Sequence, residues 1–188
     1  MKRRAFLGHT GAAFGGSWIT MTLPAILAAS GAASSARAEG NAFRILSPSE
    51  AIEFEAIAAQ IIPSGDTPGA TEAGVIWFMD TVLADNESAA LVPLREGLLG
   101  LQADIRETYA TESFASLDNA RQTEVLRGIE NTPFFDTLRF LTVAGMFCNP
   151  SQGGNRDGVG WKLIGFEGPL PTQPPFGYYD ADYTKKGA

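Results

Sequence analysis

The sequence predicts an all-α protein, a small bundle of about five helices followed by a long, irregular C-terminal wrap. Apolar residues recur at intervals of three and four along five segments, the period of a helix buried on one face. No segment shows the convincing alternation of a half-buried strand. The final forty residues hold five of the eleven prolines, many glycines and several aromatic side chains that need a surface to pack on. This composition favours an ordered wrap over a disordered tail.

The first 38 residues have the layout of an export signal. A basic start at residues 2–4 precedes an uncharged stretch, and Ala36-Arg37-Ala38 forms a small-residue cleavage site. The paired arginines followed by Phe6-Leu7 indicate the twin-arginine type. The alternative is an uncleaved anchor, for which the glycine-rich and serine-rich stretch is only weakly apolar. We therefore expect cleavage after Ala38, one helical domain over residues 39–188, and a periplasmic location, membrane-associated through a complex or through an uncleaved signal.

Charge and residue counts exclude several classes of function for residues 39–188. Residues 1–38, which we call the leader, hold four of the fourteen basic residues and none of the twenty-one acidic ones. Residues 39–188 therefore carry a formal charge of −11, which repels nucleic acid. Their only cysteine is Cys148, and the only histidine of the chain, His9, lies in the leader. A disulfide within the domain, a Cys/His zinc site, covalent haem attachment and a Ser-His-Asp site are all excluded. We expect no cofactor, metal or catalytic residue in this chain.

The expected lack of a cofactor contrasts with the twin-arginine type of the leader. The twin-arginine route exports folded proteins, commonly because they carry a cofactor inserted in the cytoplasm. One resolution is that the cofactor belongs to a partner and that this chain supplies the export signal.

The first two helices follow from their ends and their apolar spacing. Ser47, Pro48 and Glu50 form a capping box that starts a helix, and Pro63 ends it. The segment over residues 71–85 carries apolar residues at helical spacing and predicts one continuous second helix.

Three further helices follow. Leucines at residues 91, 94, 98 and 101, with Ile105, form a narrow apolar seam that favours bundle packing over a coiled coil. A short fourth helix within residues 113–131 has Ser116 or Asp118 as its cap. The fifth runs from Thr132-Pro133 to Asn149-Pro150 and is apolar on nearly all sides, so it is central or faces a partner.

The glycine-rich segment over residues 148–169 raises the question of phosphate binding. A P-loop requires a glycine before its lysine, but Trp161 precedes Lys162. A dinucleotide fingerprint requires a third glycine where Leu163 stands, and a strand where a helix is expected. The segment is better interpreted as a loop whose glycines allow positive φ or close backbone approach. Arg156 and Asp157 could pin this loop internally or to a neighbour.

The other reactive residues have ordinary interpretations. Glu50 and Glu53 suit the N-terminal part of a helix, and no pair of acids indicates a hydrolase. Cys148, after an apolar helix, is expected to be buried and inert. The tyrosines at residues 178, 179 and 183 favour packing on the bundle or a partner over stacking on a sugar or a base.

Two segments, IIPSGDTPGATEAGVIWFMD (61–80) and TVAGMFCNPSQGGNRDGVGWKLIGFEGP (142–169), resemble the gluconate 2-dehydrogenase subunit 3 family, the small or gamma subunits. The resemblance covers nearly the whole chain, and the second segment is the more specific. It implies a partner, a large FAD-containing flavoprotein of the glucose-methanol-choline (GMC) type that oxidises a sugar, sugar acid or glycoside. Electrons would pass to a c-type cytochrome with haem c, and the small subunit would aid maturation and export. The family has no established catalytic residues to carry over.

We therefore predict a non-catalytic escort subunit that binds the flavoprotein, satisfies the twin-arginine export machinery and stays bound outside. The alternatives are a stand-alone periplasmic sugar-binding module and an enzyme that uses carboxylates alone. The predicted partner interface comprises Gly153, Gly154, Asn155, Arg156, Asp157, Trp161, Lys162, Phe166, Tyr178 and Tyr179.

Overall fold

A computed structural model describes residues 42–85 and 89–166 of the chain, and every regular element in these two ranges is a helix. The all-α fold class is confirmed. In chain order the elements are α4 (Pro48–Ile61), α5 (Ala70–Ala73), α6 (Val75–Asp85), α7 (Leu91–Tyr109), α8 (Asn119–Ile129), α9 (Pro133–Phe147), the 3-10 turns η1 (Pro150–Gln152) and η2 (Arg156–Gly158), and α10 (Val159–Leu163).

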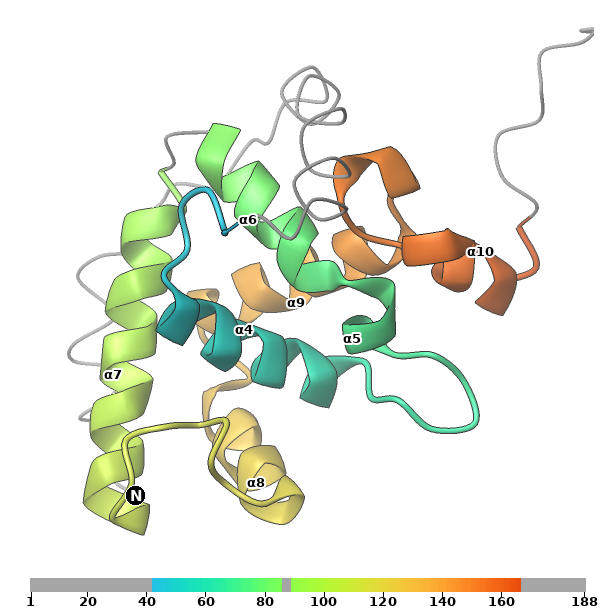
Figure 1. Cartoon of the computed structure of the whole chain (residues 1–188). Helices are drawn as coiled ribbons and strands as arrows, with labels where there is room; N and C mark the ends of the chain where they lie inside the picture. Colours follow the sequence, from blue (N-terminus) through green and yellow to red (C-terminus); the bar gives the residue numbers. More distant parts are fainter. Residues whose placement is uncertain (1–41, 86–88, 167–188) are drawn as a thin grey trace, which may run out of the picture.

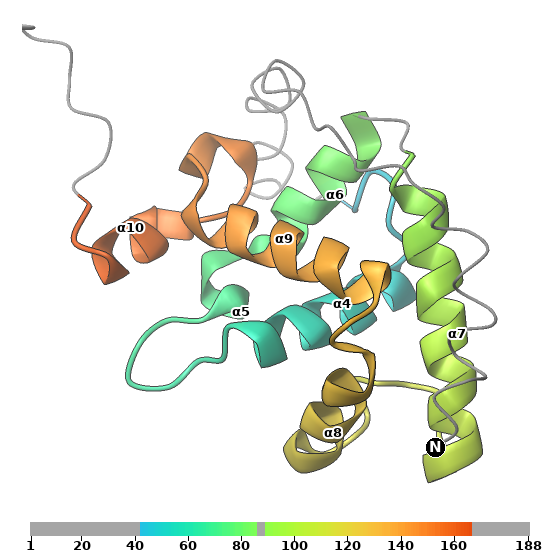
Figure 2. The same ribbon diagram turned by 180° about the vertical axis from the view of Figure 1, so that it is seen from behind.

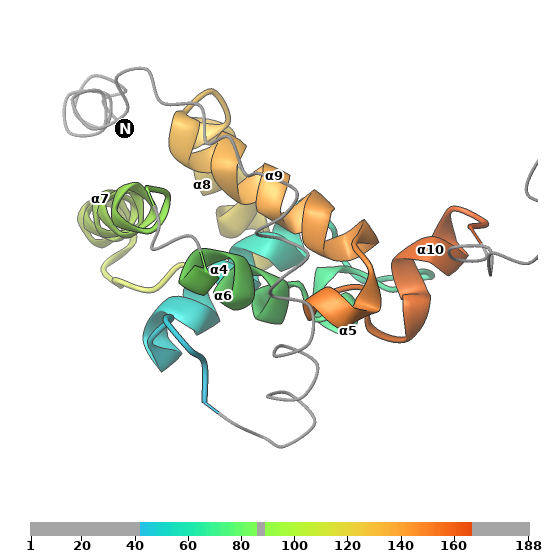
Figure 3. The same cartoon turned by 90° about the horizontal axis from the view of Figure 1, so that it is seen from above.

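Helix α9 is the centre of the bundle. It packs against each of the other six α-helices in the described ranges. Figure 1 shows α4 and α6 on one side of α9, Figure 2 shows α9 from the opposite side, and Figure 3 shows α7 end-on at the edge. Phe134, Leu138 and Leu141 are fully buried, whereas Phe140 and Val143 are exposed. The prediction that this helix is central is confirmed, and it also carries an exposed apolar strip.

The predicted helix starts are confirmed in their capping contacts. The Ser47 hydroxyl accepts the Glu50 N–H at 3.2 Å, and the Glu50 carboxylate accepts the Ser47 N–H at 2.8 Å. Asp118, rather than Ser116, caps α8, and Thr132 caps α9. Burial raises the pKa of Glu50, but hydrogen bonds from Arg95 and Ser47 outweigh that effect and hold the pKa below its usual value.

The second predicted helix is wrong in one respect, because Gly74 divides it into α5 and α6. Gly74 has a φ of 66° and ψ of 38°, the left-handed region that ends helices and that glycine enters without steric cost. Its N–H donates to the Thr71 carbonyl at 3.0 Å. Apolar residues continue at helical spacing on both sides of the break, so the pattern alone does not reveal it.

Glu53 lies in the first half of α4, as expected, but its side chain also has a role that the sequence does not indicate. Its side chain is 4% exposed. It accepts a hydrogen bond from the Ser113 hydroxyl at 2.6 Å and another from the Phe114 N–H at 2.8 Å. Glu53 therefore ties α4 to the loop between α7 and α8, and the fully buried Phe114 ring sits at that joint.

We predict that Glu53→Ala lowers the free energy of unfolding by about 2–3 kcal/mol, because it leaves the buried Phe114 N–H without an acceptor. Urea denaturation followed by circular dichroism measures this change. Glu96→Ala is the matched control, since Glu96 lies exposed on α7 and its loss should change stability by less than about 0.5 kcal/mol. Equal effects of the two substitutions would contradict the structural role of Glu53.

Candidate functional site

The glycine-rich segment folds back onto the C-terminal end of α9. After Cys148 the chain forms η1, η2 and α10, which lie together beyond that end of α9 (Figure 2). Contacts join α10 to α9, α5 and η2. The segment is thus a compact cap on the central helix rather than an open phosphate-binding loop.

Asn155 is the hub of this cap. It is 0% exposed and adopts a left-handed backbone with φ 43°. Its N–H donates to the Gly145 carbonyl and its side-chain amide donates to the Cys148 carbonyl, both at 2.8 Å. Its side-chain oxygen accepts the Gly160 N–H at 2.8 Å. One buried asparagine therefore links the end of α9 to the start of α10.

Two glycines allow this close approach. A Cβ atom on Gly154 would lie 2.2 Å from the Gly145 carbonyl oxygen, and a Cβ atom on Gly160 would lie 2.0 Å from that of Met146. Both obstacles are backbone atoms, so no side-chain movement relieves the clash. The requirement for glycine here is close packing against a helix end, as the sequence interpretation expected.

Trp161 completes the cap. Its indole N–H donates to the Phe147 carbonyl at 2.9 Å. Together with the two donors of Asn155, it satisfies carbonyl groups at the end of α9 that have no partner within the helix. The side chains of Asn155 and Trp161 are therefore directed toward the protein's own backbone.

The outer surface of the cap carries exposed apolar side chains on an ordered backbone. Leu163, Ile164 and Phe166 are 42%, 61% and 46% exposed, and we call these three residues the apolar patch. The Ile164 N–H bonds to the Gly160 and Trp161 carbonyls, and the Phe166 N–H bonds to the Trp161 carbonyl at 2.8 Å. The Phe166 ring meets the Trp161 ring edge-on at 5.3 Å. The patch is thus held in place by contacts that leave its apolar surface open.

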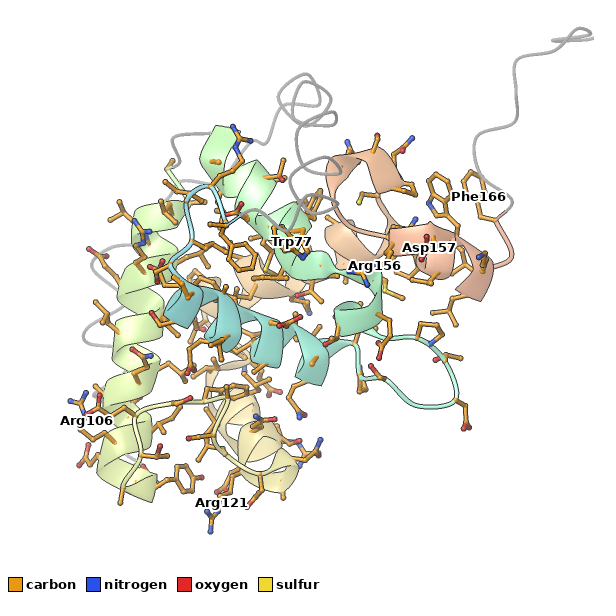
Figure 4. All side chains as sticks on the ribbon, viewed as in Figure 1. Trp77, Arg106, Arg121, Arg156, Asp157 and Phe166 are labelled. Carbon is orange, nitrogen blue, oxygen red and sulfur yellow. The ribbon has the colours of Figure 1, made fainter. Side chains whose placement is uncertain are left out.

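The predicted interface residues divide into buried and exposed groups. Gly153, Gly154 and Asn155 are buried and shape the cap from within, and Trp161 is half-buried. Figure 4 shows Asp157 and Phe166 on the α10 side of the molecule and Arg156 between Trp77 and Asp157, all far from Arg106 and Arg121. Lys162 is also exposed. Tyr178 and Tyr179 lie outside the described residues.

Sequence reasoning missed Leu163 and Ile164 as surface residues. The signal was present, because two large apolar side chains follow Lys162 directly and precede the turn at Gly165. A five-residue helix has too few turns to bury adjacent apolar side chains on one face.

Cys148 follows α9 and is half-buried. Burial raises the pKa of its thiol to about 11, and backbone hydrogen bonds from Gly154 and Cys148 offset only part of that effect. Its thiol donates to the Gly145 carbonyl at 3.4 Å. At neutral pH the group is an unreactive thiol, as its position after an apolar helix suggested.

A separate cavity of about 470 Å³ lies between α4, α8 and α9, away from the cap. Apolar Ile61, Leu126 and Phe135 line it together with Arg127 and Arg139. Across residues 42–85 and 89–166, no cluster of three or more histidine, cysteine or acidic side chains could hold a metal ion. In the same ranges, no helix combines the length and apolar character needed to cross a bilayer.

We predict that Gly160→Ala destabilises the protein by about 2–3 kcal/mol or detaches α10, because the new methyl group meets the Met146 carbonyl. Thermal unfolding measures the loss of stability, and a change in Trp161 fluorescence reports the detachment of α10. Gly65→Ala is the control, since a Cβ atom there meets nothing within 4 Å. For Gly160→Ala, an unchanged unfolding curve together with unchanged Trp161 fluorescence would show that the cap is not packed as described.

We predict that iodoacetamide alkylates Cys148 slowly at pH 8 in the folded protein. A pKa of about 11 leaves on the order of a hundredfold less thiolate than an unfolded chain has. The raised pKa also means that the folded state holds its proton more tightly, so stability falls as the pH rises from about 9 to 11. Intact mass against time measures the reaction at this single cysteine, and rapid alkylation of folded protein at pH 8 would refute the prediction.

Comparison with known proteins gives one finding. The model of the family described as gluconate 2-dehydrogenase subunit 3 matches residues 48–168, which include every helix from α4 to α10 and the whole cap. No curated protein and no solved structure matches the chain. Because the family model spans more than half of the sequence, the chain belongs to the gluconate 2-dehydrogenase subunit 3 family.

Proposed function

We propose that the chain is a non-catalytic accessory subunit that binds and escorts a larger dehydrogenase subunit. Its membership in a family of dehydrogenase subunits supports an accessory role. The observation that carries the proposal is the apolar patch, which presents Leu163, Ile164 and Phe166 on a hydrogen-bonded backbone. Apolar side chains that are exposed yet fixed in position are typical of a surface that another protein covers.

The rigidity of the patch favours binding. Much of the cost of forming an interface is the ordering of side chains and loops. Here the hydrogen bonds of Asn155 and Trp161 order the segment before any partner arrives. The cap also carries the exposed charges of Arg156, Asp157 and Lys162, a combination of apolar and charged side chains that is expected of an interface with a polar rim.

The partner that we propose is a flavoprotein of the GMC type that holds FAD and oxidises a sugar, sugar acid or glycoside. A c-type cytochrome with haem c would accept its electrons. The leader over residues 1–38 would direct the folded pair through the twin-arginine export machinery to the periplasm, and the small subunit would stay bound there. The lack of any histidine after residue 38 supports placing the chemistry in the partner.

The decisive experiment is purification of the tagged chain from the periplasm of its native host. We expect a yellow complex with a flavin absorbance spectrum, a second and larger chain, and sugar oxidation that depends on that chain. A colourless single chain of the mature mass would overturn the proposal and favour the stand-alone sugar-binding module, which ligand titration would then test.

We predict that Ile164→Glu lowers recovery of the larger subunit at least about tenfold, because it places a charge in a desolvated interface. Ile164 is 61% exposed, so the substitution should leave thermal stability nearly unchanged. Leu99→Glu is the matched control, since Leu99 is 66% exposed on α7 and lies outside the patch. Arg156→Ala and Trp161→Ala test the rest of the cap, and full recovery with all three cap variants would rule out this surface.

A further inference from the structure

A short segment just before α4 is tied to the bundle by a buried carboxylate. Asp80, on α6, is 2% exposed. Its carboxylate accepts three backbone hydrogen bonds, from the N–H groups of Arg44 at 2.8 Å and of Ile45 and Leu46 at 3.0 Å each. Such contacts to an ionised group are stronger than those between neutral groups. We call residues 43–47, held in this way, the N-terminal clamp.

Two further contacts hold the same segment. The Phe43 ring stacks on the Trp77 ring of α6 with centroids 4.5 Å apart. Arg95, on α7, donates to the Ile45 carbonyl at 3.0 Å and also binds the Glu50 carboxylate. Helices α6 and α7 therefore fix the clamp, although it has no regular secondary structure and lies before the residues that the family model matches.

The position of the clamp relative to the leader gives it a role. Residues 39–42 alone separate the expected cleavage site at Ala38 from the anchored Phe43. A fully extended chain over these five steps spans at most about 17 Å. If the clamp opened, residues 43–46 would also become free. The extended chain after Ala38 would then span about 30 Å.

We propose that the Asp80 clamp is a fold-dependent anchor for the export signal. It fixes the point at which the leader joins the domain, and it does so only when α6 and α7 are packed. The export machinery, which carries folded proteins, thereby meets the leader together with the folded domain. This inference rests on the proposed function, because it takes residues 1–38 as an export signal.

Limited trypsin digestion of the full-length precursor tests the anchor directly. Arg37 lies before residues 39–42, and Arg44 lies inside the clamp. In the wild-type precursor, we expect early cleavage after Arg37 and protection of the Arg44–Ile45 bond. In Asp80→Asn, cleavage after Arg44 should rise at least about tenfold, because proteolysis follows the population of the opened segment. Intact mass identifies the fragment that starts at Ile45.

Two further variants keep the test interpretable. Phe43→Ala removes only the half-buried ring that stacks on Trp77, so it should loosen the clamp even if Asp80→Asn fails to fold. Asp66→Asn is the matched control, since Asp66 lies in an exposed turn, and it should leave the digestion pattern unchanged.

Export in the native host provides the functional readout. We expect a lower periplasmic fraction for both clamp variants and a normal fraction for Asp66→Asn. Equal export of all variants, with or without faster cleavage after Arg44, would overturn the anchor. A wild-type chain that is never exported would instead overturn the proposed function, so the two failures are distinguishable.

Discussion

The carbonyl groups at the C-terminal end of α9 set the constraint on which the rest of the structure depends. A helix leaves its last carbonyls without internal partners, and burying them unpaired is costly. Because α9 is the central helix, its end lies against other parts of the chain. Asn155 and Trp161 bring the missing donors, and Gly154 and Gly160 let the backbone come close enough to deliver them. The glycine-rich motif is therefore the cap of the core helix.

This constraint connects the core to the surface. The Trp161 indole N–H donates to the Phe147 carbonyl, which fixes the ring against α9. The backbone N–H groups of the apolar patch donate in turn to the carbonyls of Gly160 and Trp161. Leu163, Ile164 and Phe166 consequently stay exposed without being loose. The same residues that complete a helix end can thus prepare a docking surface, which explains why one motif combines buried glycines with exposed apolar and charged side chains.

Local signals in the sequence predict much of the fold, whereas long-range pairings escape them. Ser47, Asp118 and Thr132 are recognisable caps because a cap bonds to residues only two or three positions away. The burial of Glu53 depends on a tertiary contact, since Glu53 meets Phe114 more than fifty positions along the chain. The break at Gly74 is local, but the apolar spacing continues across it and hides it. The sequence indicates that the glycines of the motif allow close packing, but it does not indicate that they pack against the end of α9.

Two buried acids hold distant segments of the chain together. Asp80 and Glu53 each accept backbone N–H groups from a distant segment, so both carboxylates serve as fixed acceptors for the chain itself. Asp80 lies on α6, which packs directly on α9, and α9 in turn carries the cap. The N-terminal clamp, which α6 holds, and the cap, which packs on α9, therefore rest on two helices in direct contact. Under the proposed function, a single packed unit of α6 and α9 carries both the attachment point of the export signal and the surface that the partner covers.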